Sequence, residues 1–65
     1  MKIENMMGNG KYTIDPKIVE FLSVNPHLKP LYAISETKIT CFDTGLNRNW
    51  DVVLFDGSVR VVHCQ

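Results

Sequence analysis

The sequence predicts a small α+β domain, in which a short N-terminal helix packs on a three-stranded antiparallel meander. The chain contains an Asp-Gly turn between two β-branched runs near its C-terminus and one capped amphipathic segment near its N-terminus. At 65 residues it is long enough for one domain at most. We therefore expect a single domain over residues 1–65, with residues 1–10 either flexible or forming an additional hairpin.

The additional hairpin depends on Asn9-Gly10, a dipeptide typical of tight hairpin turns. A two-residue turn there would pair Met7 with Tyr12 and Asn5 with Ile14. The flanking residues are poor in β-formers, so a flexible tail stays open as the alternative.

The helix begins at Asp15-Pro16, since Asp is a favoured N-cap and Pro fits the first helical position. It ends at Asn25-Pro26, because the residue before a proline is disfavoured in helical conformation. Its apolar stripe consists of Ile18, Val19, Phe21 and Leu22. A helix this short requires tertiary packing to be stable.

The middle of the chain is interrupted by Pro26 and Pro30. We expect a turn through residues 26–29, followed by a short helix or an extended segment at 31–34. Residues 38–42 alternate like a strand, and residues 43–49 form a polar loop that is long for a hairpin. We expect the apolar residues of this region to lie largely inside or to cap an edge; they are Leu28, Leu31, Tyr32 and Ile34.

The C-terminal residues 50–65 contain the clearest local signal. Asp56-Gly57 separates two runs of β-branched and aromatic residues, a pattern that favours a two-residue hairpin turn. Counting outward from that turn pairs Phe55 with Ser58 and, at the far end, Trp50 with His63.

Alternation along the two strands then defines two faces. The predicted core face consists of Trp50, Val52, Leu54, Val59 and Val61, with His63 at its rim. The other face is mixed and consists of Asp51, Val53, Phe55, Ser58, Arg60, Val62 and Cys64. We expect Asp51 and Arg60 to meet diagonally there, while the apolar members of this face require cover from another layer or a partner.

Charge and hydropathy exclude several classes of function. Lys plus Arg equals Asp plus Glu at seven each, so the formal net charge of zero disfavours a nucleic-acid-binding surface. No apolar run is long enough for a membrane span, and the N-terminus lacks the apolar region of a signal peptide. We therefore expect a cytoplasmic protein with reduced thiols.

The two cysteines and two histidines do not have the spacing of a metal site. His63 and Cys64 are adjacent in a predicted strand and point to opposite faces, so we expect no metal and no cofactor. A hydrolase would need Cys41 activated by His63, and a chain this small offers little room for a dry pocket. We expect no enzymatic activity. A disulfide between Cys41 and Cys64 is geometrically open but disfavoured by a reducing compartment.

The segment Gly-Leu-Asn-Arg-Asn-Trp-Asp at residues 45–51 resembles a segment of chromo-barrel and Tudor-type SH3-like domains. The resemblance implies binding of methylated lysine by aromatic residues near Trp50. It covers less than a third of the chain, and Leu46 stands where those domains have their first aromatic residue. Residues 56–62 also resemble the end of a WD-type propeller blade, but one chain of this length cannot form a propeller. We assign no family from either resemblance.

The sequence therefore predicts a non-catalytic protein-interaction module or small regulatory protein. It would bind a protein partner, or a second copy of itself, through the C-terminal hairpin. The candidate binding residues on the mixed face are Val53, Phe55, Arg60 and Val62. In the alternative, an SH3-like or Tudor-like reader binds modified peptide or single-stranded nucleic acid through Trp50 and the 43–49 loop, with Asn47 and Arg48 contributing.

Overall fold

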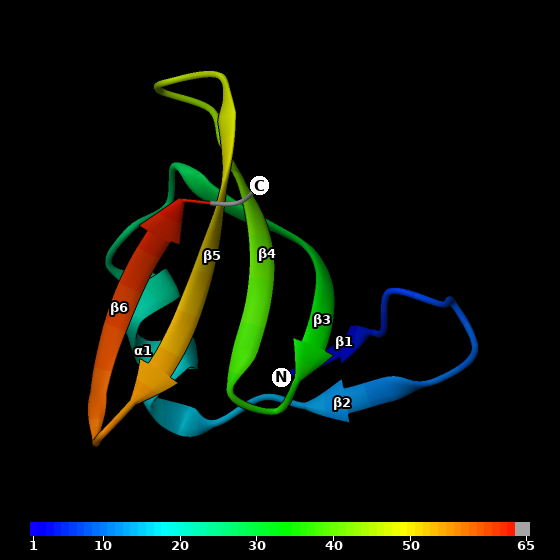
Figure 1. Ribbon diagram of the computed structural model, residues 1–65. Helices are drawn as coiled ribbons and strands as arrows, with labels where there is room; N and C mark the ends of the chain where they lie inside the picture. Colours follow the sequence, from blue (N-terminus) through cyan, green and yellow to red (C-terminus); the bar gives the residue numbers. More distant parts are fainter. Residues whose placement is uncertain (64–65) are drawn as a thin grey trace.

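We describe residues 1–63 from a computed structural model, in which a helix covers one face of an antiparallel sheet (Figure 1). The main sheet has four strands in the order β3-β4-β5-β6, and β1 and β2 form a separate two-stranded sheet beside β3. The α+β prediction is confirmed, but the expected three-stranded meander is wrong by one strand. The elements are β1 (Lys2–Glu4), β2 (Lys11–Thr13), α1 (Pro16–Ser23), β3 (Leu28–Ser35), β4 (Lys38–Asp43), β5 (Arg48–Phe55) and β6 (Ser58–His63).

The additional strand is β3, which continues through Pro30. We expected a turn through residues 26–29 there, followed by a short helix or an extended segment at 31–34. Pro30 pairs with Cys41, and the register shifts between Pro30 and Tyr32. An edge strand with such an irregularity tolerates proline, because the missing N–H does not interrupt a continuous ladder. Of the residues expected inside or capping an edge, Leu28 is buried, whereas Leu31 lies on this edge strand and is 48% exposed.

Helix α1 begins as predicted. Oδ1 of Asp15 accepts a hydrogen bond from the N–H of Lys17 at 2.9 Å, and Pro16 occupies the first position. The helix ends at Ser23, with Val24 as its C-cap, shortly before Pro26. Of the predicted stripe, Ile18 and Leu22 are buried, while Val19 and Phe21 pack against the core from its margin.

The hairpin of β5 and β6 has the predicted register throughout. Asp56 and Gly57 have positive φ angles of 52° and 79°, as a two-residue turn of this type requires. The six observed pairs are Phe55 with Ser58, Leu54 with Val59, Val53 with Arg60, Val52 with Val61, Asp51 with Val62 and Trp50 with His63.

The N-terminal hairpin exists, but its predicted register is wrong. Tyr12 pairs with Ile3, not with Met7. The reason is a wider loop, in which Asn5 bonds both ways to Asn9 through side-chain contacts of 3.0 and 3.2 Å. This register places Ile3 and Tyr12 against the core.

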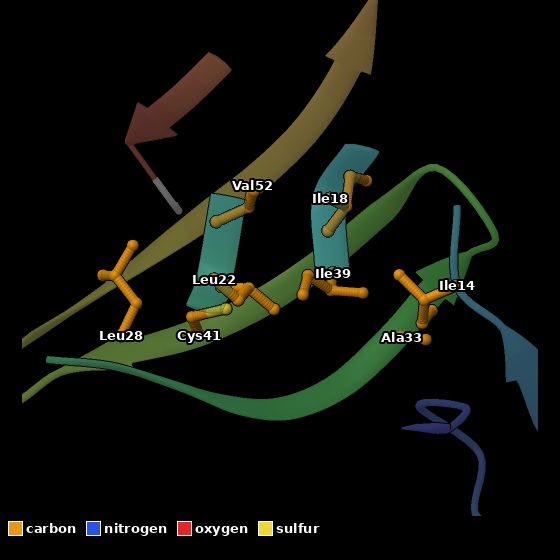
Figure 2. Close-up of a cluster of buried hydrophobic side chains, with 8 residues drawn as sticks. All are labelled: Ile14, Ile18, Leu22, Leu28, Ala33, Ile39, Cys41 and Val52. Carbon is orange, nitrogen blue, oxygen red and sulfur yellow. The ribbon is translucent and has the colours of Figure 1, made fainter. Parts of the chain in front are cut away.

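The core lies between α1 and the sheet, and Figure 2 shows its members. It consists of Ile14, Ile18, Leu22, Leu28, Ala33, Ile39, Cys41 and Val52. The predicted core face of the hairpin is largely confirmed, since Trp50, Leu54 and Val59 pack on this cluster. Val61 is the exception: it lies on the outermost strand and is 38% exposed, because the short α1 leaves part of that strand uncovered. Across residues 1–63, no helix has the length and apolar character needed to cross a membrane.

Candidate functional site

The sheet surface opposite α1, which we call the open face, brings together four of the predicted site residues. Val52 and Ile39 are paired and buried beneath α1. Because side chains alternate along a strand, their neighbours in β5 and β6 point the other way. The predicted residues that share the open face are Val53, Phe55, Arg60 and Val62.

Phe55 and Arg60 form the most exposed part of this face. The Phe55 side chain is 61% exposed, and Val62 is 41% exposed. The guanidinium carbon of Arg60 lies 5.2 Å from the centroid of the Phe55 ring, a cation–π arrangement. The expected diagonal contact between Arg60 and Asp51 is replaced by this stacking, since Asp51 has other partners.

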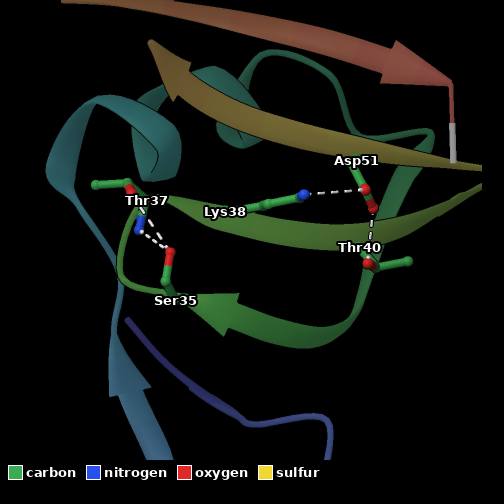
Figure 3. A network of polar contacts seen from close by, with 5 residues as sticks. All are labelled: Ser35, Thr37, Lys38, Thr40 and Asp51. Carbon is green, nitrogen blue, oxygen red and sulfur yellow. Dashed lines mark hydrogen bonds and ion pairs between the residues drawn. The ribbon is translucent and has the colours of Figure 1, made fainter.

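Those partners lie at the centre of the open face (Figure 3). The hydroxyl of Thr40 donates to Oδ1 of Asp51 at 2.7 Å, and Nζ of Lys38 lies 3.9 Å from Oδ2. Thr40 is only 2% exposed, so its hydroxyl is satisfied by Asp51 within the protein. The ion pair with Lys38 is partly exposed and contributes little. The polar groups at the centre of the open face are thus paired within the protein, whereas its β5–β6 side presents exposed apolar side chains.

Trp50 and Arg48 lie on the other face, at the end of the sheet where β4 and β5 are connected. The Trp50 indole N–H donates to Oδ2 of Asp43 at 3.2 Å. The guanidinium carbon of Arg48 lies 5.1 Å from the Trp50 ring centroid, and the His63 ring meets the Trp50 ring edge-on at 5.6 Å. Nη2 of Arg48 also lies 3.1 Å from Nε2 of His63. The predicted residues Trp50 and Arg48 therefore do not share a surface with Phe55.

The loop beside Trp50 is shorter than the predicted 43–49 loop. Asp43 pairs with Arg48 as part of the β4–β5 ladder, which leaves residues 44–47 as the connection. Asn47 has a positive φ angle of 56°, and its N–H donates to the carbonyl oxygen of Asp43 at 2.8 Å. Asn47 is thus a turn residue, a role that asparagine fills because it tolerates this conformation.

Asp43 organises the loop, a role that the sequence did not reveal. Its Oδ1 accepts hydrogen bonds from the N–H groups of Gly45 and Leu46 at 2.8 and 3.1 Å, and the side chain is almost fully buried. Two effects on the pKa of Asp43 oppose each other. Burial alone would raise it, but the hydrogen bonds from Leu46, Gly45 and Trp50 outweigh burial and hold the pKa below its ordinary value. An Asp followed by Thr-Gly was the available signal, since Asp commonly accepts from the backbone two residues ahead.

Cys41 is a core residue. It is fully buried, and burial, with a smaller contribution from the charge of Asp51, raises the pKa of its thiol to about 11. The thiol is therefore protonated near neutral pH, the unreactive form. The predictions that involve Cys64 lie outside the described residues, and among residues 1–63 no three His, Cys, Asp or Glu side chains are grouped as metal ligands.

A groove that the sequence did not predict lies between α1 and β6. Its volume is about 410 Å³, and its apolar walls come from Phe21, Val24 and Val59. Lys17 and Glu20 line its rim, and Nζ of Lys17 donates to the carbonyl oxygen of Gly57 at 3.1 Å. The exposed Val24, just outside the helix stripe, was the only hint of it.

Comparisons of the chain with protein-family models, curated proteins and solved structures find no match. What supports a function for this protein is therefore the geometry of residues 1–63. That geometry offers three surfaces: the open face around Phe55, the Trp50–Asp43 cluster, and the groove beside β6.

Proposed function

We propose that this protein is a non-catalytic interaction module that binds a protein partner through the open face of its C-terminal hairpin. The observation that carries the proposal is the exposure of Phe55 and Val62 on one continuous face, opposite the helix. The half-buried Val53 lies between them on this face, so the three side chains form an apolar strip along the hairpin, and such exposed strips are typical of interaction sites.

The chemistry of this face suits a binding hot spot. Aromatic residues and arginine are the types that contribute most to protein–protein binding energy. Arg60 already lies stacked on Phe55, at 5.2 Å from the ring centroid. A partner that binds this stacked arrangement as it stands would lose less conformational entropy than one that has to rearrange the two side chains.

The polar residues next to this pair limit the size of the apolar patch. Asp51 accepts from Thr40 and lies close to Lys38, so its carboxylate is already paired within the protein. A partner that covers Phe55 therefore need not supply a counter-charge for Asp51. The apolar side chains thus lie on the β5–β6 side of the open face, next to a polar region whose charges are paired within the protein.

The alternative proposal, a reader of modified peptide or single-stranded nucleic acid through Trp50, has less support. A methylated lysine would have to lie over the ring of Trp50. The guanidinium of Arg48 already occupies that kind of position, 5.1 Å from the ring centroid. The indole N–H is also engaged by Asp43.

The test compares immobilised wild-type protein with Phe55→Ser as baits in extract from the source cells. Leu46→Ser is the matched control, because Leu46 is similarly exposed (63%) but lies in the β4–β5 loop, away from the open face. A protein retained by wild type and by Leu46→Ser would then be purified and its Kd measured. We expect Phe55→Ser to weaken binding by at least about tenfold, as for a hot-spot aromatic.

The folded state of each variant is checked by its thermal unfolding. A partner that binds Phe55→Ser as tightly as wild type would contradict the proposal. Selective loss of binding in Leu46→Ser would place the interaction at the loop and favour the alternative.

A further inference from the structure

The two edges of the main sheet differ. The outer side of β3 is met by the N-terminal segment, where Asn5 forms a bridge with Ala33 and the N–H of Met6 donates to the Ala33 carbonyl oxygen at 3.2 Å. At the other edge, β6 pairs only with β5 among the described residues. The outer side of β6 is therefore the bare edge of the sheet.

A backbone hydrogen bond of Leu54 fixes which residues of β6 carry the free backbone groups. The N–H of Leu54 donates to the carbonyl oxygen of Thr37, on the side of β5 away from β6. Backbone direction alternates along an antiparallel strand, so Val53 and Phe55 point toward β6 and bond with Arg60 and Ser58. The residues that direct N–H and C=O outward are Val59, Val61 and His63.

Strand β6 lacks the usual protection of an edge. Natural edge strands are commonly blunted by proline, lysine or a bulge. The strand reads Ser-Val-Arg-Val-Val-His, with three β-branched valines and Arg60 as its one permanently charged residue. Its pairing with β5 runs without a register shift. Such a strand is a ready template for a further strand.

We propose that a second copy of this chain pairs its β6 antiparallel to this β6, about a two-fold axis at Val61. The pairing joins the two sheets into one continuous eight-stranded sheet. The inference rests on the proposed role of the C-terminal hairpin in binding, but it uses the edge of the hairpin and not its open face.

Charge selects the register. Two registers pair five residues of each strand: one centred on Arg60 and one centred on Val61. The first sets the two arginines directly opposite each other, where like charges destabilise a sheet. The second sets Arg60 opposite Val62 of the second copy and Val59 opposite His63 of the second copy. Only the register centred on Val61 combines this length with separated charges.

The groove accounts for the remaining contact area. Five paired residues alone make a thin interface, and a stable one buries about 1,000 Å² or more. The register centred on Val61 places His63 of the second copy beside Val59, which lines the groove. That histidine lies 3.1 Å from Nη2 of Arg48, so the guanidinium of the second copy comes toward the rim, where Glu20 is the acidic residue and Lys17 donates to the carbonyl oxygen of Gly57. The second copy also covers the apolar walls of the groove at Phe21 and Val24. Val24 is 72% exposed in the single chain.

The test is the molecular mass in solution across a concentration series under reducing conditions, for wild type, Val61→Pro and Val61→Thr. Proline at 61 removes an outward N–H and leaves the β5 ladder intact, whereas threonine keeps that N–H in a similar shape. We expect wild type and Val61→Thr to dimerise with rising concentration and Val61→Pro to stay a folded monomer. A wild type that is monomeric throughout, or a Val61→Pro that dimerises like wild type, would overturn the proposal.

Three further measurements keep the test decisive. In wild type, amide exchange at Val59, Val61 and His63 should slow as concentration rises, and unchanged exchange would refute edge pairing even if Val61→Pro failed to fold. Glu20→Lys should weaken the dimer several-fold, because a lysine at this position would repel the guanidinium of Arg48 from the second copy. Phe55→Ser should dimerise normally. Loss of dimer in Phe55→Ser but not in Val61→Pro would place self-association on the open face, which overturns the edge pairing and leaves the proposed function standing.

Discussion

Two aromatic residues of one strand, Trp50 and Phe55 of β5, have opposite environments. Trp50 packs on the core margin, donates to Asp43 and is stacked by Arg48. Phe55 lies on the open face with 61% of its surface exposed, and its one stacked neighbour, Arg60, is itself exposed. The strand thus carries a structural aromatic residue at its start and an accessible one at its end.

The difference shows how a chain of 65 residues uses one aromatic residue for stability and leaves another exposed. Every polar contact of Trp50 is made within the protein, so the cluster closes one end of the sheet and fixes its loop. Phe55 contributes little to the core and keeps its surface available. Exposure and internal hydrogen bonding, not residue type, distinguish the two roles.

The largest effect is expected from Trp50→Ala. Removing this side chain takes away packing on the core and the hydrogen bond to Oδ2 of Asp43, so the free energy of unfolding should fall by about 3 kcal/mol. Phe55→Ala is the matched control and should cost about 1 kcal/mol or less, since it removes little buried surface. Urea unfolding followed by circular dichroism measures both. Equal losses would mean that the open face is covered in solution.

The second effect is a dependence of stability on pH. The pKa of Asp43 is lowered in the folded state, so its charged form stabilises the fold above the ordinary carboxyl pKa of 3.8, and this contribution is lost as pH falls through the folded-state pKa. Asp43→Asn cannot ionise and should not show this part of the acid dependence. Unfolding curves of wild type and Asp43→Asn, recorded from neutral pH downward, should therefore converge in acid. Parallel curves over the whole range would contradict a role for the charge.

The smallest effect concerns the turns at the two ends of β5. Gly57 has a φ of 79°, and an added Cβ would meet no heavy atom within 4 Å, so Gly57→Ala should cost only the conformational strain of about 1 kcal/mol. Asn47 already tolerates a φ of 56°, so Asn47→Gly should be close to neutral. Thermal unfolding of both variants measures the contrast. A neutral Gly57→Ala would argue against the positive φ at that turn.

The parts of the fold that were predictable have strong local determinants. Asp56-Gly57 sets the register of the β5–β6 hairpin, and Asp15-Pro16 sets the start of α1. Strand β3 was not predictable, because proline is tolerated in a strand mainly at an edge or a bulge, and both depend on tertiary pairing. The Asn9-Gly10 signal misled for a similar reason, since the side chain of Asn5 closes a wider loop.

The candidate site was predictable in its side chains but not in its partners. Alternation alone places Val53, Phe55, Arg60 and Val62 on one face. The contacts of Asp51 with Thr40 and Lys38 come from a neighbouring strand, and alternation within the hairpin does not reveal them or the stacking of Arg60 on Phe55. The groove beside β6 depends on where α1 lies across the sheet, which no periodicity in the helix specifies.

The strand order of the main sheet has a kinetic consequence. Each strand from β3 to β6 pairs with its neighbour in sequence, through turns of only a few residues. Closing such short loops costs little chain entropy, so this sheet can assemble by successive hairpins without a slow search for distant partners. The long-range steps are the docking of α1 on β5 and β6 and of the N-terminal segment on β3. Until α1 docks, the same face that later forms the core is exposed beside the bare edge of β6, and the rate of that docking sets how long the nascent sheet is open to misassembly.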